Sequence, residues 1–380
     1  PSWVIAEGEK RPTRTLNYKD PIKADRTMNA PFTVIKIVEF NPSSRAHISN
    51  RLVNKYGWNP KDFTDNGQAK IDETILSKLP YPEAKHVAKY FMLQKRLGQL
   101  AEGNQGWLRV CANGKIHGSV NTNNAATGRA THSHPNLAQI PSMRAAYGKE
   151  CRELFTVPKG WKLMGADASG LELRALAGYM AIYDGGAYVD VVLDGDIHTV
   201  NQIAAGLASR DESKRFIYAF LYGGGDQLIG ELVGGGAKEG KRIKKSFLDK
   251  TPALKKLREA VSKAAERGFI KGLDGRHIHI RSPHAALNFL LQSAGAIICK
   301  QWLVEFENEM QAQGYRHGWD GDYCMCAWVH DEIQVAVRED LADKVGHIAV
   351  QTIQKVTEVF NFRCPLDGEF NVGNSWAETH

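Results

Sequence analysis

Apolar residues in the first hundred positions recur at the three- and four-residue spacing of amphipathic helices. One such pattern follows Ser44, a residue that can cap a helix, and stops at Gly57. A second runs over 83–100. The first forty residues are rich in Pro, Lys and Arg with little periodicity, so we expect a tail or linker with a short strand at Phe32–Phe40.

Beyond these helices the pattern alternates between strand and helix periods. The stretch 107–120 alternates well enough to predict a hairpin, 122–141 is a polar loop, and 161–166 is a short apolar strand. From 171 to 273 the pattern is almost wholly helical, interrupted by glycine clusters. The last third predicts helices over 285–313 and 340–358 and a hairpin over 325–337. The sequence therefore predicts an α+β fold, a small antiparallel sheet with two helical lobes.

The composition shows that positive charge is concentrated in one segment of the chain. Hydrophobic residues make up 43% of the 380 residues and charged residues 24%, which are ordinary globular values, and the formal net charge is +7. Between Lys238 and Lys271 we count twelve Lys or Arg and four Asp or Glu, so the basicity is concentrated there. This run is either a solvated helix face or a phosphate-binding surface.

Neither cysteines nor long apolar segments indicate secretion or a membrane. Six cysteines fall far below the density of a disulfide scaffold, and we interpret them as reduced and structural. The uncharged stretch Ser282–Cys299 contains enough polar residues to predict an amphipathic buried helix rather than a membrane span. No signal peptide opens the chain, and we expect a cytoplasmic protein with no membrane partner.

Candidate chemistry begins at the strand predicted over 161–166. That strand ends at Asp167 and a turn leads into a helix. A carboxylate at a strand end can bind a hard cation together with the backbone carbonyls that the turn frees. An Asp in this position can equally be a helix N-cap, and this segment alone leaves both interpretations open.

A second acidic site lies at the bend between two alternating segments. His330, Asp331 and Glu332 separate them, so we expect both carboxylates at a hairpin tip, where they are costly unless solvated or neutralised by a metal. The alternative is a plain Asp-containing turn. If Asp167 and Asp331 come together, they can clamp two magnesium ions roughly 3.5 to 4 Å apart, the arrangement used for in-line displacement at phosphorus.

A helix between these two sites carries cations and aromatic rings on one face. Ser209 opens it with a capping box, and steps of four place Arg210, Lys214, Tyr218 and Tyr222 along one stripe. Two cations followed by two rings suit a nucleotide, with the triphosphate against the cations and the base or sugar against the rings. The alternative is an amphipathic helix whose tyrosines belong to the core.

Taken together these residues resemble the family A DNA polymerases, most closely the replicative polymerases of short-tailed phages of the T-seven group. The resemblance covers the chain from about Asn41 to His380. The motifs that carry it are Asp167–Arg174, Arg210–Gly223 and Val329–Val335, supported by Thr127–Thr131, Pro135–Pro141 and Leu290–Gly295.

The resemblance implies a right-hand polymerase architecture, with a small antiparallel palm sheet, helical fingers and a helical thumb. The implied divisions are a basic linker or tail over 1–40, a partial thumb over 41–103, the first part of the palm over 104–171, the fingers over 172–289 and the second part of the palm over 290–380. The Lys238–Lys271 run then belongs to the fingers and is best interpreted as a template-contacting surface.

The resemblance also implies roles for single residues. Asp167 and Asp331 look like the two aspartates that bind two Mg²⁺ ions, with the Ala168 carbonyl as a further ligand and Glu332 as an adjacent acidic residue of secondary role. Lys214 resembles the residue that donates a proton to the departing pyrophosphate.

The remaining implied contacts are with nucleotide and DNA. Glu172 is similar to the residue that closes off the 2′ side of the sugar, and Tyr at position 218 goes with acceptance of dideoxynucleotides. The implied nucleotide contacts are Glu172, His198, Arg210, Lys214, Tyr218 and Tyr222; the implied primer-template contacts are Arg129, Gln292 and His330.

The activity that the resemblance implies is template-directed DNA synthesis from dNTPs on a primer 3′-hydroxyl, in phage genome replication. Phage relatives carry a 3′→5′ exonuclease domain ahead of the polymerase, and this sequence has no room for one, so we expect no proofreading in this chain. The first forty residues resemble the end of an insertion that binds a processivity factor in some relatives, and the first thumb helix expected before it is missing.

Two explanations account for these departures. The sequence is either cut from a longer chain or belongs to a split polymerase whose companion polypeptide carries the exonuclease and the remaining thumb. The split form is slightly favoured because Pro1 would follow a removable initiator Met. Such a subunit would be inactive without its companion.

Two further function classes are weighed against the polymerase. A single-subunit RNA polymerase is disfavoured by Glu172, where a small residue would leave room for ribose. A DNA-binding remnant without activity is disfavoured because Asp167 and Asp331 are both present.

Overall fold

The computed structural model describes residues 39–380. The chain forms two compact units, Pro1–Leu97 and Gly98–His380, and each has its own apolar core. Apart from Glu39 and Phe40, the predicted basic tail with its short strand at Phe32–Phe40 lies outside the described residues.

The described part of the first unit is helical. The Ser44 side chain caps α1 by accepting the backbone N–H of His47, and Gly57 ends the helix with a left-handed φ of 64°, which favours glycine. Both helices predicted here are confirmed. The unit contains α1 (Arg45–Tyr56), α2 (Glu73–Lys78) and α3 (Pro82–Leu97).

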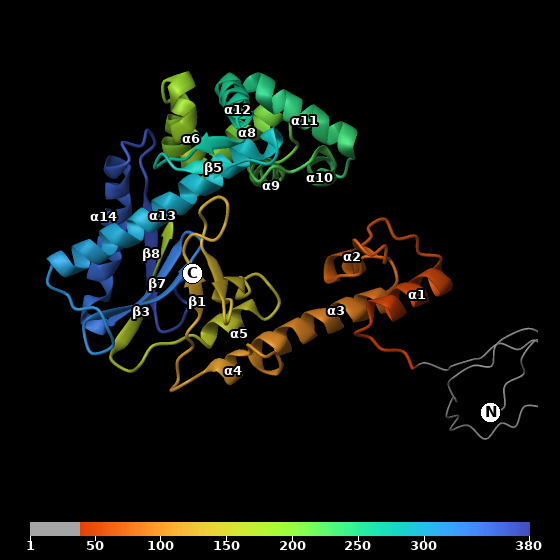
Figure 1. The fold of residues 1–380 in the computed structure, drawn as a ribbon, viewed down its shortest axis with the longest axis horizontal. Helices are drawn as coiled ribbons and strands as arrows, with labels where there is room; N and C mark the ends of the chain where they lie inside the picture. Colours follow the sequence, from red (N-terminus) through yellow and green to blue (C-terminus); the bar gives the residue numbers. More distant parts are fainter. Residues whose placement is uncertain (1–38) are drawn as a thin grey trace, which may run out of the picture. The chain divides into compact units, whose positions relative to one another are not determined.

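A four-stranded antiparallel sheet lies at the centre of the second unit (Figure 1), in the order β6-β7-β3-β8. Its strands are β3 (Trp161–Ala168), β6 (Tyr323–Val329), β7 (Glu332–Arg338) and β8 (Gly368–Gly373). The predicted apolar strand and the predicted hairpin are therefore confirmed, and they pair with each other although they lie far apart in the chain.

The two faces of this sheet differ in character because side chains alternate along each strand. One face presents Met164, Ala166, Ile333 and Val335 to the main core. Helices α13 (Ala286–Ala312) and α14 (Ala342–Val359) belong to this core, and α14 lies along β3 and β8 (Figure 1). The other face carries the polar residues of the candidate site.

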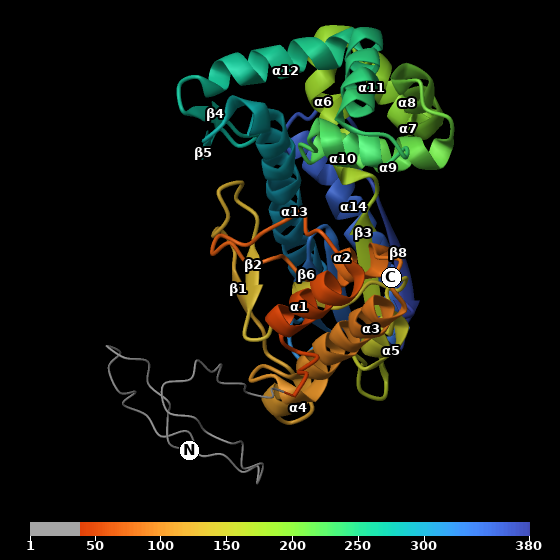
Figure 2. The same ribbon diagram turned by 90° about the vertical axis from the view of Figure 1, so that its right-hand side faces the viewer.

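A helical lobe connects β3 to α13, and Figure 2 shows it gathered at one end of α13. Three phenylalanines in its core, Phe216, Phe220 and Phe247, pack their rings against one another. The helices are α6 (Leu171–Asp184), α7 (Ala187–Asp194), α8 (Ile197–Ala205), α9 (Arg210–Leu221), α10 (Asp226–Glu231), α11 (Ala237–Lys250) and α12 (Pro252–Ala265).

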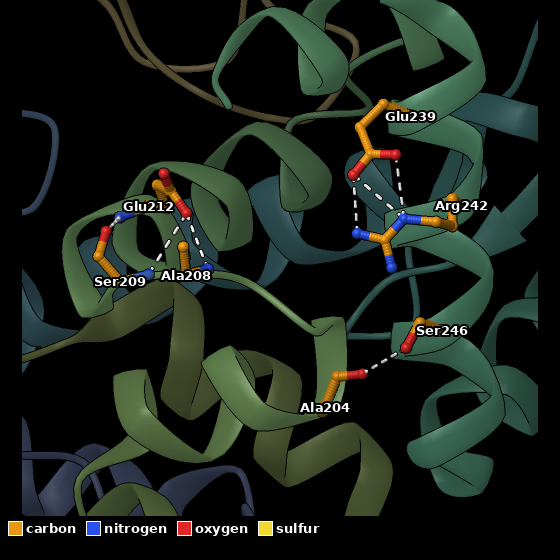
Figure 3. Close-up of polar contacts among 7 residues, drawn as sticks. All are labelled: Ala204, Ala208, Ser209, Glu212, Glu239, Arg242 and Ser246. Carbon is orange, nitrogen blue, oxygen red and sulfur yellow. Dashed lines mark hydrogen bonds and ion pairs between the residues drawn. The ribbon is translucent and has the colours of Figure 1, made fainter. Parts of the chain in front are cut away.

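Side-chain hydrogen bonds fix the ends of α8 and α9. The predicted capping box is confirmed: Ser209 accepts the Glu212 backbone N–H at 3.2 Å, and Glu212 accepts the backbone N–H groups of Ser209 and Ala208 (Figure 3). Ser246 on α11 donates its hydroxyl to the Ala204 carbonyl at 3.0 Å, which ties α11 to the last turn of α8 (Figure 3).

The prediction of a hairpin over 107–120 was wrong. Trp107–Val110 forms a short helix, α4, and Ser119–Asn121 is β1, which pairs with β2 (Thr131–Ser133). Its apolar residues fit one helical turn as well as an alternating strand, and the structure buries Trp107 while Leu108 stays 76% exposed. One buried anchor therefore organises this stretch.

Other local differences are small. The helical pattern predicted to 273 ends in a strand pair, β4 (Phe269–Lys271) with β5 (His277–His279). The remaining short elements are the π-helical turn Gly98–Glu102, α5 (Gly148–Glu153) and the 3₁₀ turns Leu137–Gln139, Pro283–Ala285 and Glu339–Leu341. No helix within residues 39–380 combines the length and apolar character needed to cross a membrane.

Candidate active site

Asp167 and Asp331 come together because β3 and β7 are neighbours. The antiparallel register places Asp167 opposite Glu332, the first residue of β7. The backbone N–H of Ala168 donates to the carbonyl of Asp331 at 3.1 Å. A two-residue turn, His330 and Asp331, therefore lies against the end of β3, and His330 takes a φ of 59° to make it.

The pKa values of both aspartates reflect this crowding. Burial, followed by the charges of Asp331 and Glu332, raises the pKa of Asp167 to about 7. Burial, followed by the charge of Glu172, raises the pKa of Asp331. Ionising both carboxylates here is costly unless a cation balances them, and this requirement fits a divalent metal ion.

The donor set limits how such a cation would be held. Within residues 39–380, no three His, Cys, Asp or Glu side chains gather into a metal-binding group. The available ligands are the two aspartates and backbone oxygens such as the Ala168 carbonyl at the end of β3. An all-oxygen set with few protein ligands suits Mg²⁺, which keeps several waters and uses oxygens of its substrate.

The structure corrects the expected position of Glu332. It does not lie at the hairpin tip but begins β7, is 4% exposed, and accepts hydrogen bonds from Trp376 Nε1 (2.5 Å), Gln334 Nε2 (2.6 Å) and His380 Nδ1 (2.8 Å). Burial raises the pKa of Glu332, but these hydrogen bonds and the His380 charge outweigh burial, so the net pKa lies below its ordinary value. The strand pairing at Val329–Glu332 shortens the turn and buries this side chain.

A cavity of about 330 Å³ opens beside Asp331 and collects several of the predicted residues. Arg129, Glu172, Tyr222 and His330 line it together with Asp331. Sequence reasoning missed other residues of the wall, among them His132, Trp328 and Cys299. Nothing in their local sequence distinguishes them from core residues, since His132 on β2, Cys299 on α13 and Trp328 on β6 lie far apart in the chain and only the fold brings them to one cavity.

Glu172 and Tyr222 are joined directly across this cavity. The Tyr222 hydroxyl donates to Glu172 Oε1 at 2.6 Å, and burial, followed by this hydrogen bond, raises the pKa of Tyr222 to about 12. Asn288 Nδ2 donates to the Tyr222 carbonyl at 2.8 Å, and Gln292 Nε2 donates to Asn288 Oδ1 at 2.5 Å. Gln292 thus reaches the same group through Asn288, a residue the sequence did not single out.

Tyr218 lies one turn before Tyr222 and is half-buried. Burial, then the charges of Glu172 and Asp331, raise its pKa, which places its hydroxyl in the field of the acidic site. The structure does not support the alternative in which both tyrosines belong to the core. Tyr222 remains 43% exposed, and Tyr218 is only partly buried against the main core, while Phe216 and Ile217 of the same helix are buried.

The predicted cations form a second group at the start of α9. Burial, followed by the charges of Arg210 and Lys214, lowers the pKa of His198, so these three residues share one electrostatic neighbourhood. Lys214 is exposed, and Arg210 forms an ion pair with Asp196 at 2.9 Å. Asp196 had no role in the sequence-based prediction.

The basic run 238–271 forms much of α11 and α12. Some of its charges pair locally, Arg242 with Glu239 at 2.7 Å and Lys245 with Asp249 at 3.0 Å. Lys255, Lys256 and Lys263 on α12 are exposed and have no ion pair within residues 39–380. A solvated surface and a phosphate-binding surface both remain compatible with this arrangement.

We expect Asp167→Asn to stabilise the metal-free chain at pH 8. The pKa of Asp167 in the folded state, about 7, lies above its unfolded value, so the folded chain loses stability as the pH rises from about 4 to about 7. A rise in pKa from about 4 to about 7 corresponds to about 4 kcal/mol, and we expect the free energy of unfolding of the variant to be about 2–4 kcal/mol higher in urea with EDTA present.

Asparagine carries no charge to lose, so the advantage of the variant should shrink as the pH falls toward 5. Added Mg²⁺ should stabilise the natural chain more than the variant, because only the natural chain offers the carboxylate. Equal stabilities at pH 8 would show that Asp167 is not under electrostatic strain.

Comparisons with known proteins identify the family to which this chain belongs. The model of DNA polymerase family A matches residues 21–378. The chain is 49% identical to the DNA-directed DNA polymerases of Enterobacteria phage T3 and Escherichia phage T7, over 92% of its own length and 54% of theirs. It therefore spans about half the length of these curated relatives.

A solved structure shows the same fold. The POL domain of Pol1 from M. smegmatis, in complex with DNA primer-template and dNTP, superposes with a TM-score of 0.75 at 21% identity, over 89% of this chain and 61% of that one. The architecture is the right-hand fold of polymerases, which confirms the predicted fold class. The chain belongs to DNA polymerase family A.

Proposed function

We propose that this chain is a template-directed DNA polymerase that adds dNTPs to a primer 3′-hydroxyl in phage genome replication. The observation that carries the proposal is the meeting of Asp167 and Asp331 at the ends of neighbouring strands, beside a cavity lined by Glu172 and Tyr222. Family membership and the phage relatives support the same activity.

The proposed divisions follow the expected ones. Residues 104–171 and 290–380 would form the palm, because they supply the strands of the central sheet. Residues 172–289 would form the fingers, and 41–103 a partial thumb. We also propose the basic helices α11 and α12 as a template-contacting surface.

We propose that two Mg²⁺ ions bind at Asp167, Asp331 and the Ala168 carbonyl. Such ions, when bound, would lower the pKa of the attacking hydroxyl and stabilise charge on the leaving pyrophosphate. The raised pKa of each aspartate supports the assignment, since a cation would relieve the repulsion that raises it. Glu332 has a secondary, structural role, because Trp376, Gln334 and His380 already satisfy it.

The chain's own residues bind and orient the substrates. Arg210, Lys214 and His198 would contact the triphosphate, with Lys214 donating a proton to pyrophosphate. Glu172, held by Tyr222, would face the 2′ side of the sugar, and Tyr218 would lie against the sugar near the acidic site. Arg129, Gln292 and His330 would contact the primer-template near its growing end, where minor-groove acceptors are common to all correct pairs.

Two further proposals concern partners. The chain would act with a companion polypeptide that carries an exonuclease and the remaining thumb, and with a processivity factor. It would act in the cytoplasm of an infected bacterium. An RNA polymerase remains disfavoured, because Glu172 occupies the cavity wall where ribose would need room.

Primer extension tests the proposed function. We expect the purified chain to extend a labelled primer-template with Mg²⁺ and four dNTPs, to reject ribonucleotides and to terminate readily with dideoxynucleotides. Salt-sensitive binding without extension would mean that the chain needs a companion. Ribonucleotide use equal to dNTP use would overturn the assignment of Glu172.

A further inference from the structure

One exposed carboxylate joins the two helices that carry the cations of the site. Asp196 precedes α8, and its Oδ1 accepts the backbone N–H groups of His198 (3.1 Å) and Thr199 (3.3 Å), which caps the helix. Its Oδ2 accepts the Thr199 hydroxyl at 2.7 Å. Both oxygens also accept from Arg210 Nε, at 3.2 and 2.9 Å.

Asp196 binds the Nε edge of the Arg210 guanidinium and leaves its terminal nitrogens available for another ligand. Asp196 uses only Nε, and within residues 39–380 the two terminal guanidinium nitrogens of Arg210 have no hydrogen-bond partner. These nitrogens are the pair that can bind phosphate oxygens side by side. Because Asp196 holds Nε, the directions in which the two terminal nitrogens can point are restricted.

The last turn of α8 and the first turn of α9 are already held by other contacts. Ser246 and Lys250 on α11 donate to the carbonyls of Ala204 and Ile203 in the last turn of α8, at 3.0 and 3.1 Å. The capping box at Ser209 fixes the first turn of α9 (Figure 3). The contact of Asp196 with Arg210 then links the first turn of α8, which bears His198, to that fixed start of α9.

We infer that Asp196 is a positioning residue for the incoming nucleotide: it holds Arg210 by its Nε edge and fixes His198 beside it, so that both face a triphosphate. The inference rests on the proposed function, because it assumes that Arg210 and His198 bind phosphate. An ion pair so exposed contributes little to folding stability, so its effect should appear in nucleotide binding.

A competing interpretation of the contact between Asp196 and Arg210 predicts the opposite change in nucleotide affinity. If Asp196 merely competes with the triphosphate for Arg210, removing its charge should strengthen binding. If it positions Arg210, removing it should weaken binding, because the nucleotide must then immobilise a long side chain itself. Immobilising one such side chain costs roughly 3- to 10-fold in affinity.

Asp196→Ser separates the two roles of this residue. Serine still caps α8 but is too short to reach Arg210. We expect the dissociation constant of the correct dNTP, measured by equilibrium titration on a dideoxy-terminated primer-template, to rise about 3- to 10-fold. The maximal rate of extension on a normal primer should change less than about 2-fold. Asp196→Asn, which keeps the cap and one acceptor oxygen, should show a smaller loss.

Asp211→Asn is the matched control. The hydrogen bond and the charge of Asp196 are the main causes that raise the pKa of Arg210, and the exposed Asp211 beside it adds only its charge, without a hydrogen bond from the guanidinium. This variant removes the same charge and should leave the dissociation constant within about 2-fold of the natural value. An equal loss in both variants would overturn the inference in favour of a general charge effect.

A double-mutant cycle shows whether Asp196 acts through Arg210. In an Arg210→Lys background the Nε contact is absent, so Asp196→Ser should cause little further loss of affinity. Additive losses, tighter binding in Asp196→Ser, or a lower melting temperature with unchanged affinity would each overturn the inference. Failure of the natural chain to bind any dNTP would instead overturn the proposed function together with it.

Discussion

Asp331→Asn is expected to lower the rate of primer extension by about 1,000-fold or more. The substitution keeps the size of the side chain and removes the charge that, with Asp167, would hold the catalytic cations. Those cations supply several kcal/mol of stabilisation to charge developing on phosphate oxygens, and about 4 kcal/mol corresponds to 1,000-fold. Single-turnover extension with saturating dNTP measures this loss directly.

Binding of primer-template should survive the same change. The backbone contact from Ala168 N–H to the Asp331 carbonyl does not involve the side chain, so the turn should keep its place at the end of β3. Asp340→Asn is a suitable control, since Asp340 is an exposed acid just beyond the opposite end of β7. Normal extension by Asp331→Asn would mean that the cation site lies elsewhere.

The sequence was sufficient for several features that depend on neighbours in the chain. The start of α1 at Ser44, the capping box at Ser209 and the hairpin around His330 all follow from local spacing, and all are observed. The meeting of Asp167 with Asp331 needed more, because the pairing of β3 with β7 joins distant segments. The resemblance to a polymerase family implied that the two aspartates meet; periodicity alone did not, and the strand pairing itself was not predicted.

What the sequence missed depends on packing between distant segments. The Trp376 and His380 side chains that hold Glu332 come from beyond β8, so the buried position of Glu332 could not be read from an alternating hairpin. Asp196 was not singled out from the sequence, and its contact with Arg210 becomes visible only when α8 and α9 pack together. In both cases the contacts of a charged side chain come from segments that are distant in the chain or packed only in the folded state.

Two substitutions at Lys214 separate its role as a cation that binds phosphate from its role as a proton donor. Lys214→Gln removes both, and we expect the maximal rate of extension to fall about 100-fold or more, within the range that a general acid contributes. Lys214→Arg keeps a cation that can bind phosphate, but a guanidinium does not release its proton at accessible pH. Arginine should therefore restore dNTP binding much more than it restores the maximal rate.

The position of Lys214 explains why charge and proton transfer need to be separated there. It lies one turn after Arg210 on an exposed face of α9, and together their charges help lower the pKa of His198. Losing Lys214 would therefore weaken the whole proposed phosphate-binding group, and we expect the dissociation constant for dNTP to rise. Arg215→Gln, the adjacent exposed cation on the same helix, controls for net charge and should change neither constant by more than about 2-fold. A full maximal rate in Lys214→Arg would leave Lys214 a phosphate ligand and assign the proton to another donor, for which His198 is a candidate because the charges of Arg210 and Lys214 act on it.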